Sequence, residues 1–213
     1  MDKKITVLIA DDHPLARAGV RSILESASDI LVVGEAQDGN EAQKLVEESR
    51  PDILLLDLKM PGLSTMEVEK WVRANYPETI TLVLTAHDRD FYLAGMMDAG
   101  ASGYISKNER SENLIAAIRR TARGESLFTQ EQLERVRRWH ESAGQKWESL
   151  TSREQEVLKL LSDGLSNSDI AKAIGITSKT VAYHITNILE KLGVHSRQEA
   201  VAWAHKNLPD NLE

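Results

Sequence analysis

Five polar residues in the first half of the chain are of the types that handle a phosphoryl group. Asp11 and Asp12 come directly after one short apolar run, and Asp57 comes directly after another. Thr85 ends a third run and Lys107 follows a fourth. Three neighbouring carboxylates would be neutralised by one lysine and one Mg2+, which prefers carboxylate oxygens. A neutralised Asp57 could then attack phosphorus and become an acyl phosphate, whose oxygens Mg2+, the Thr85 hydroxyl and the Lys107 ammonium would hold.

Each of these residues also has an ordinary structural interpretation. Asp12, which lies two positions before Pro14, could be the N-cap of the next helix. An aspartate at a strand end, such as Asp57, is commonly a turn former, and Lys107 could be a solvated surface charge. The phosphoryl interpretation depends on the whole set, which recurs at the ends of successive apolar runs.

The elements that would position this set form an alternating pattern. Short apolar runs occur at residues 5–10, 30–34, 53–56, 80–85 and 103–106, and amphipathic segments with helical spacing lie between them. This pattern predicts an α/β domain with a doubly wound, parallel, five-stranded sheet. The runs are apolar throughout, which indicates strands buried on both faces. Ligands of such sheets lie beyond the carboxyl ends of the strands, where the five polar residues would meet.

At these positions the sequence resembles the CheY-like receiver domain of two-component response regulators. The resemblance covers residues 5–123. The motifs that carry it are Asp11-Asp12, Asp57-Leu58-Lys59-Met60-Pro61-Gly62, Thr85-Ala86, Ala99-Gly100-Ala101 and Tyr104-Ile105-Ser106-Lys107. Proline stiffens the loop beside the aspartate, and Gly62 permits the turn that follows.

The resemblance implies a role for each of these residues. Asp57 would be the phosphoacceptor. Asp11 or Asp12, Asp57 and the backbone carbonyl of Lys59 would bind Mg2+. Thr85 and Lys107 would sense the phosphoryl group, and Tyr104 would be the switch aromatic.

Such a switch would follow from the charge of the acyl phosphate. An acyl phosphate carries more negative charge than a carboxylate, so it should draw Thr85 and Lys107 inward and vacate space for Tyr104. The alternative for Tyr104 is an ordinary half-buried strand aromatic. In similar receivers the positions of Lys59 and His87 tune dephosphorylation, so both residues are expected to change its rate, in a direction that the sequence leaves open.

The pattern changes after Gly124. Residues 129–146 are polar and charged and are interpreted as a linker helix. Four short helices are expected at 152–163, 167–174, 178–192 and 196–206, and the first three have N-cap candidates in Thr151, Ser166 and Thr177. Glycine-containing breaks on both sides of the short second helix predict a helix-turn-helix. The expected domains are 1–125, a linker at 126–146, and a small all-α, four-helix domain at 147–213.

The segment 178–192 has two distinct faces. Its apolar stripe consists of Val181, Ile185, Ile188, Leu189 and Leu192, and must pack inward. The opposite face carries Lys179, Ala182, Tyr183, Thr186, Asn187 and Glu190. A helix of this kind could enter a DNA major groove, although any small helical bundle contains amphipathic helices.

The full string of the second part looks like the LuxR/NarL-type DNA-binding domain. The match spans residues 148–204 and includes Leu150-Thr151-Ser152-Arg153-Glu154, Gly164-Leu165-Ser166-Asn167, Thr180-Val181 and Lys191-Leu192-Gly193-Val194. It implies that the third helix enters the major groove and that the fourth helps to form a dimer. The order of the two matches is that of NarL/FixJ-type response regulators.

The DNA-contacting positions contain one departure from this family. The residue after Thr180-Val181 is often lysine, and here it is Ala182, which offers only apolar contact. Base readout should then fall on Tyr183, Thr186 and Asn187, while Lys179 and the Thr180 hydroxyl contact phosphates. The alternative for Tyr183 is a partly packed surface aromatic, and His184 is expected to be structural. Val201 and Trp203 are candidates for either a dimer contact or the core.

Composition limits the classes of protein that fit. The 213 residues include no cysteine, which excludes disulfides, thiol catalysis and cysteine-ligated zinc. The net charge of −7 argues against binding nucleic acid through bulk positive charge. Residues 126–213 hold 11 basic and 12 acidic residues, a net charge of −1, so two copies on a two-fold site would be needed for tight binding. No apolar run is long enough for a membrane span, and a cytoplasmic protein is expected.

These observations predict a phosphorylation-controlled transcription regulator rather than an enzyme. A sensor histidine kinase would pass a phosphoryl group to Asp57 with Mg2+, and the phosphorylated homodimer would bind double-stranded promoter DNA. One alternative is a phosphohydrolase that forms an aspartyl phosphate, but Lys59 stands where such enzymes place a second aspartate as general acid. The other is a scaffold protein whose C-terminal bundle binds protein, which the near-neutral charge of that part favours.

Overall fold

The computed structural model describes residues 3–208, and its internal contacts group them into two units. The first unit comprises the chain up to Asp88 together with Tyr92–Leu133. The second comprises Arg89–Phe91 and the chain from Glu134 onward. None of the helices in the described residues is both long enough and apolar enough to cross a membrane.

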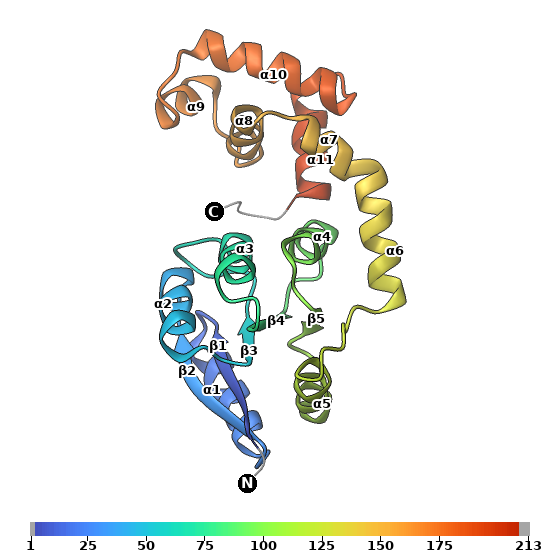
Figure 1. Ribbon diagram of the computed structural model, residues 1–213. Helices are drawn as coiled ribbons and strands as arrows, with labels where there is room; N and C mark the ends of the chain where they lie inside the picture. Colours follow the sequence, from blue (N-terminus) through green and yellow to red (C-terminus); the bar gives the residue numbers. More distant parts are fainter. Residues whose placement is uncertain (1–2, 209–213) are drawn as a thin grey trace. The chain divides into compact units, whose positions relative to one another are not determined.

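The first unit is built on one five-stranded sheet (Figure 1). Its strands are β1 (Ile5–Ala10), β2 (Ile30–Ala36), β3 (Ile53–Leu56), β4 (Ile80–Thr85) and β5 (Gly103–Ser106). They pair in parallel in the order β2-β1-β3-β4-β5. The predicted α/β fold class is therefore confirmed. The order reverses between β1 and β3, so the carboxyl ends of these two strands form the crevice in which ligands of such sheets bind.

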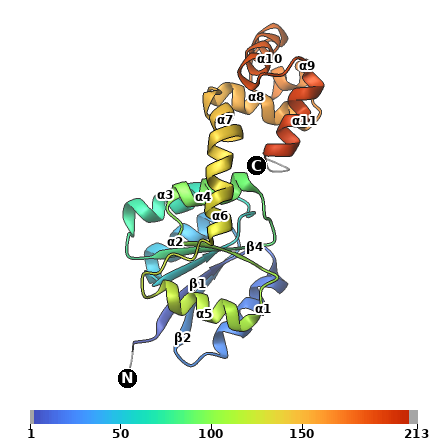
Figure 2. The same ribbon diagram turned by 90° about the vertical axis from the view of Figure 1, so that its right-hand side faces the viewer.

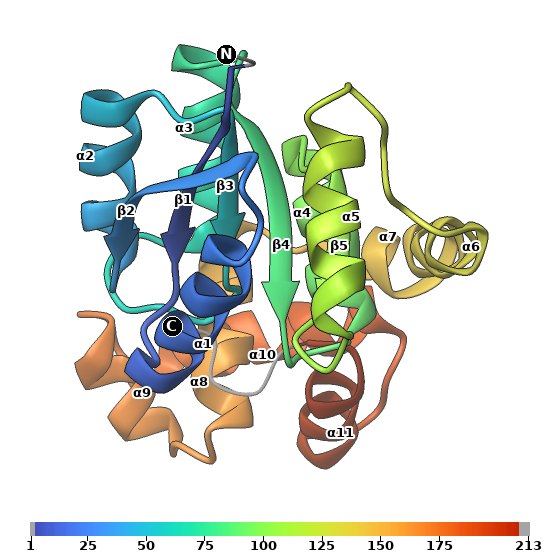
Figure 3. The same cartoon turned by 90° about the horizontal axis from the view of Figure 1, so that it is seen from below.

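Five helices alternate with these strands. They are α1 (Pro14–Glu25), α2 (Gly39–Ser49), α3 (Thr65–Asn75), α4 (Asp90–Ala99) and α5 (Ser111–Thr121). Helices α1 and α5 cover one face of the sheet, and α2, α3 and α4 cover the other (Figures 2 and 3). All four residues of β3 are buried, as expected for a strand covered on both faces.

The helix that follows Asp11 and Asp12 is not capped by either aspartate. The N-cap of α1 is His13, whose side chain makes no capping hydrogen bond, and Pro14 occupies the first turn. The ordinary interpretation of Asp12 as an N-cap is therefore wrong. In the loop after β3, Gly62 has a φ of 85°, which is the left-handed conformation that glycine adopts without strain.

The rest of the described chain is helical, as predicted for its second part. Residues 130–149 form α6 (Gln130–Trp139), a π-helical turn η1 (His140–Gly144) and α7 (Gln145–Ser149). They are followed by α8 (Ser152–Ser162), α9 (Asn167–Ala173), α10 (Ser178–Leu192) and α11 (Arg197–Asn207). The last four helices correspond to the four that the sequence predicts, and α9 and α10 form the helix-turn-helix. The domain limits at residues 125 and 147 stay a prediction.

The predicted N-caps position these helices. The Thr151 side chain accepts a hydrogen bond from the Glu154 N–H, and the Glu154 side chain accepts one from the Thr151 N–H. The Ser166 side chain caps α9 by accepting a hydrogen bond from the Asp169 N–H, and the Thr177 side chain caps α10 by accepting one from the Thr180 N–H. The core between α8, α9, α10 and α11 contains fully buried apolar side chains, namely Val157, Leu158, Leu161, Ile170, Val181, Ile188 and Leu192. The apolar stripe of α10 thus packs inward as predicted.

Candidate functional site

The carboxylates singled out from the sequence meet at the crevice between β1 and β3. Asp11 and Asp57 follow these strands directly, and the Asp57 N–H donates to the carbonyl of Ala10 at 2.9 Å. One ligand atom from each of Asp11, Asp12, His13 and Asp57 lies within 4.8 Å of the others. Asp11 and Asp57 are buried, whereas Asp12 is half-buried. The sheet topology therefore gathers three carboxylates at one point.

Lys107 from the end of β5 supplies a positive charge to this group. Its Nζ lies 2.7 Å from Asp11 Oδ2 and 3.1 Å from Asp57 Oδ2. Burial raises the pKa of Asp57, Lys107 lowers it and Asp11 raises it again, so that the pKa lies above the ordinary value. The contact with Lys107 therefore does not fully offset the cost of burying the Asp57 carboxylate.

These residues fit a divalent cation. Asp57 Oδ1 is buried and makes no hydrogen bond within residues 3–208. A buried carboxylate oxygen without a donor is costly unless a cation or a proton joins it. Carboxylate oxygens from Asp11, Asp12 and Asp57 are the hard donors that Mg2+ selects. Lys59, whose carbonyl is a predicted ligand, is half-buried two residues after Asp57.

Thr85 and Tyr104 both hold the loop that follows β4. The Thr85 carbonyl accepts from the Lys107 N–H at 2.8 Å, and its hydroxyl accepts from the His87 N–H at 3.0 Å. The Tyr104 hydroxyl donates to the His87 carbonyl at 2.5 Å, and the Tyr104 side chain is buried. The residue predicted as the switch aromatic is thus bonded to the same loop as Thr85.

The second candidate site is the outer face of α10. Lys179, Ala182, Tyr183 and Thr186 are exposed on it, and Thr180 and Asn187 are half-buried. Tyr183 is 65% exposed, so it is not a partly packed aromatic. The Thr186 hydroxyl donates to the Ala182 carbonyl at 3.1 Å, which leaves its oxygen able to accept. This face therefore offers polar and aromatic groups with little net charge.

Comparison with known proteins decides the family. Residues 7–119 match the response regulator receiver domain, and residues 148–204 match the bacterial regulatory proteins of the luxR family. The chain belongs to the LuxR-type response regulators. The predicted resemblance is confirmed over both parts.

Curated relatives and solved structures of this family extend over nearly the whole response regulator. The response regulator protein VraR of Staphylococcus aureus (strain NCTC 8325 / PS 47) is 39% identical over 203 residues, which are 95% of this chain and 97% of VraR. The crystal structure of the response regulator ChrA of a heme-sensing two-component system is 34% identical, covers 95% of this chain and 96% of ChrA, and has a TM-score of 0.57. RcsB of Salmonella enterica serovar Typhimurium, bound to promoter rprA with the phosphomimetic BeF3-, is 25% identical, covers 94% and 98% of the chains, and has a TM-score of 0.62.

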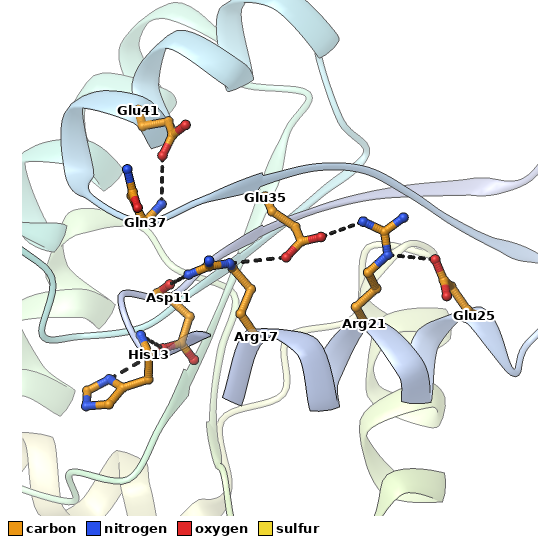
Figure 4. Close-up of polar contacts among 8 residues, drawn as sticks. All are labelled: Asp11, His13, Arg17, Arg21, Glu25, Glu35, Gln37 and Glu41. Carbon is orange, nitrogen blue, oxygen red and sulfur yellow. Dashed lines mark hydrogen bonds and ion pairs between the residues drawn. The ribbon is translucent and has the colours of Figure 1, made fainter. Parts of the chain in front are cut away.

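His13, Arg17 and Glu35 surround Asp11, and none of the three was predicted from the sequence as a site residue. His13 Nδ1 lies 2.7 Å from Asp12 Oδ1 and 3.6 Å from Asp11 Oδ1. Arg17 and Glu35 form a polar chain that reaches the Asp11 backbone (Figure 4). A histidine directly after two aspartates, and an arginine one helical turn later, were the available signals.

The last helix presents its two candidates toward the core. Val201 and Trp203 are half-buried and pack against the hydrophobic cluster of the helix-turn-helix unit. This packing favours the core role for both residues. His184 is also half-buried, in keeping with a structural role, and its ring lies 6.0 Å from that of Tyr183.

Proposed function

We propose that this response regulator controls transcription when a sensor histidine kinase transfers a phosphoryl group to Asp57. The observation that carries the proposal is the position of Lys107, whose Nζ contacts both Asp11 and Asp57 at the crevice of the sheet. A buried carboxylate with a raised pKa and an adjacent ammonium is suited to attack a phosphoryl group and to hold the charged product.

The reaction forms one bond and breaks one. An Asp57 carboxylate oxygen attacks phosphorus, the bond from phosphorus to the kinase histidine nitrogen breaks, and that nitrogen keeps the electron pair. Asp11, Asp12, Asp57 and the Lys59 carbonyl would hold Mg2+, which when bound neutralises charge on the phosphoryl oxygens. Lys107 then contacts the acyl phosphate in place of the carboxylate.

The Thr85 hydroxyl would link this change to the surface. Its oxygen now accepts from the His87 N–H, and its hydrogen would be donated to a phosphoryl oxygen, which would draw Thr85 and the bonded loop toward the site. A shift of that loop would displace the His87 carbonyl, to which Tyr104 donates. Tyr104 would therefore act as a switch rather than as an ordinary strand aromatic. Lys59 and His87 flank the site, and exchanging both should alter the lifetime of the acyl phosphate.

For the second unit, we propose that α10 enters the major groove of promoter DNA. Tyr183, Thr186 and Asn187 would read bases, and Ala182 would contact a thymine methyl group. Lys179 and Thr180 would bind phosphates. Few positive charges lie on this face, so a phosphorylated homodimer on a two-fold site would supply the needed affinity.

The two alternatives fit less well. A phosphohydrolase needs a general acid near the aspartyl phosphate, and Lys59 occupies the expected position. A scaffold protein does not need an exposed tyrosine on the outer face of α10. We therefore propose that the chain promotes only its own phosphorylation and dephosphorylation, and that it acts in the cytoplasm.

DNA binding with and without a phosphoryl mimic tests the proposal. Double-stranded fragments would be selected from a random-sequence pool with the full-length protein, Mg2+ and beryllofluoride. Beryllofluoride should tighten binding by roughly tenfold or more, and Asp57→Asn should abolish this gain. Tyr183→Ala should weaken binding roughly tenfold, whereas Gln198→Ala, an exposed position on α11, should not. Failure to recover any fragment would favour the scaffold, and turnover of a small phosphate ester would favour the phosphohydrolase.

A further inference from the structure

Arg17 of α1 makes a bond to the backbone of the acidic site. Its Nη1 donates to the Asp11 carbonyl at 2.6 Å, and its Nε donates to Glu35 Oε2 at 3.1 Å (Figure 4). Its side chain is 17% exposed. We propose that Arg17 is a positioning residue that fixes Asp11 and Asp12 for Mg2+. This inference rests on the proposed phosphoryl-acceptor function.

Asp11 lies where the regular sheet no longer holds the backbone. The paired registers of β1 end at Ala10, opposite Ala36 in β2 and Leu56 in β3. The Asp11 N–H still donates to the Ala36 carbonyl at 3.0 Å. The Asp11 carbonyl points to Arg17 instead of to a strand. Arg17 therefore fixes the peptide that joins Asp11 to Asp12, and both of these residues are proposed metal ligands.

The side chain of Asp11 is fixed from two further directions. Its Oδ1 accepts from the His13 N–H at 2.9 Å, and its Oδ2 lies 2.7 Å from Lys107 Nζ. The helix itself holds Arg17 in place, because the Arg17 N–H donates to the His13 carbonyl at 3.0 Å. The loop from Asp11 to His13 is thus closed at both ends by bonds that involve α1.

Glu35 orients the guanidinium group of Arg17. It lies opposite Ile9 in the register of β2 against β1, next to the start of the loop. Its second oxygen, Oε1, accepts from Arg21 Nη1 at 2.5 Å, and Arg21 Nε in turn donates to Glu25 at 2.7 Å. Because Glu35 already holds the planar guanidinium of Arg17, this group loses little conformational freedom when it binds the Asp11 carbonyl. Arg21 shares Glu35 with Arg17, and its described bonds are to Glu35 and Glu25.

A positioning role and a purely electrostatic role of Arg17 predict opposite changes in Mg2+ affinity when Arg17 is removed. A positive charge near the carboxylates disfavours a cation, so removing it would tighten Mg2+ binding if charge alone mattered. Loss of the bond to the Asp11 carbonyl would instead loosen the ligands and weaken binding. Outer partners of metal ligands commonly change metal affinity by roughly tenfold or more. The sign of the change therefore separates the two effects.

The test compares Arg17→Met with Arg21→Met in the full chain. Both variants remove one arginine of α1 that pairs with Glu35, and only the first removes the bond to Asp11. Magnesium chloride is titrated into each protein, and the dissociation constant is read from the amide resonance of His13. Hydrogen exchange of the loop after β1 is measured without metal.

Arg17→Met should raise the Mg2+ dissociation constant roughly tenfold and should speed exchange in the loop. Arg21→Met should change the dissociation constant less than about twofold. If Arg17→Met does not fold, Arg17→Lys takes its place, because lysine keeps the positive charge but lacks the planar guanidinium that binds Glu35 and the Asp11 carbonyl together. Unchanged or tighter binding by the Arg17 variant, or equal weakening by both arginine variants, would overturn the inference. If the wild-type protein itself bound no Mg2+, the proposed function would fail instead.

Discussion

The acidic site at the sheet crevice and the outer face of α10 use polar groups in different ways. At the crevice, Asp11 and Asp57 are buried, and one lysine contacts both. On α10, Tyr183 is 65% exposed, and its neighbours Lys179 and Thr186 are exposed as well. Buried charges depend on one another for compensation, whereas exposed groups act almost independently. Single substitutions should therefore have large effects at the crevice and smaller, more nearly additive effects on α10.

The largest effect should follow loss of the lysine at the crevice. Lys107→Met should slow phosphorylation of Asp57 by a small-molecule phosphodonor by roughly a hundredfold or more, because one fixed donor to the developing charge is lost. The matched control is Lys3→Met, since Lys3 forms an exposed pair with Asp52 at 2.8 Å. The rate is measured by intact mass over time. If the Lys107 variant were phosphorylated as fast as the Lys3 variant, Lys107 would not hold the developing charge.

The first unit contains another buried carboxylate, Glu69, whose charge changes with pH. Burial raises the pKa of Glu69 to about 7, and Thr81 and the nearby Arg73 offset this only in part. The folded state then binds a proton more tightly than the unfolded state, so this group costs stability as pH rises from its ordinary range through about 7. The free energy of unfolding of Glu69→Gln, relative to that of the wild type, should therefore rise by about 3 kcal/mol between about pH 5 and about pH 8.

Calorimetry of the full chain measures this difference in the transition of the first unit. The variant and the wild type should differ in their pH dependence only in that transition. A difference that stays constant over this range would mean that Glu69 does not titrate there.

The second unit contains a buried glutamate with the opposite shift. Although burial raises the pKa of Glu154, its bonds to Lys191 and Thr151 lower it to about 2. Its contribution to stability is therefore present above the ordinary glutamate pKa and is lost as pH falls through about 2. Glu154→Gln should lower the free energy of unfolding by about 2 kcal/mol near neutral pH. This is less than the energy equivalent of the whole pKa shift, because Lys191 is 33% exposed and solvent screens the pair. This cost should disappear in acid, as followed by thermal unfolding.

The smallest effect should come from adding one charge to α10. Ala182→Lys would add one phosphate contact, so the plot of log affinity against log salt should steepen by roughly 0.9 per protein copy. The control is Ala202→Lys, an exposed position on α11. Affinity would be measured over a range of salt concentrations on a selected DNA fragment. Equal slopes for the two variants would place position 182 away from the phosphates.

Much of the fold could be predicted because its signals are local. The apolar runs located all five strands, with only β2 extending two residues further, to Ala36, than predicted. The breaks around α9 were recognisable because Gly164 and Gly175 adopt φ values of 81° and 68°, which glycine favours. The strand order then brought Asp11, Asp57 and Lys107 together, as expected for the carboxyl edge of a parallel sheet.

Other features depend on contacts that no local pattern records. The pairing of Arg17 with Glu35 depends on the register of β2 against β1, and so it could not be read from spacing along the chain. The π-helical turn at His140–Gly144 has no sequence period of its own. A Cβ at Gly144 would lie 2.7 Å from the Trp139 ring, a close approach that only the folded chain reveals. The roles of the site residues and the domain limits stay predictions.

The position of the phosphoryl group can be determined directly. Full-length protein is incubated with Mg2+ and a phosphoramidate donor, and the acyl phosphate is mapped by reduction and peptide mass spectrometry. We expect one phosphoryl group per chain, on Asp57. It should be absent in Asp57→Asn and retained in Asp52→Asn, which changes a carboxylate at the opposite end of the same strand. If the protein took up no phosphoryl group, or kept it after Asp57→Asn, Asp57 would not be the phosphoacceptor.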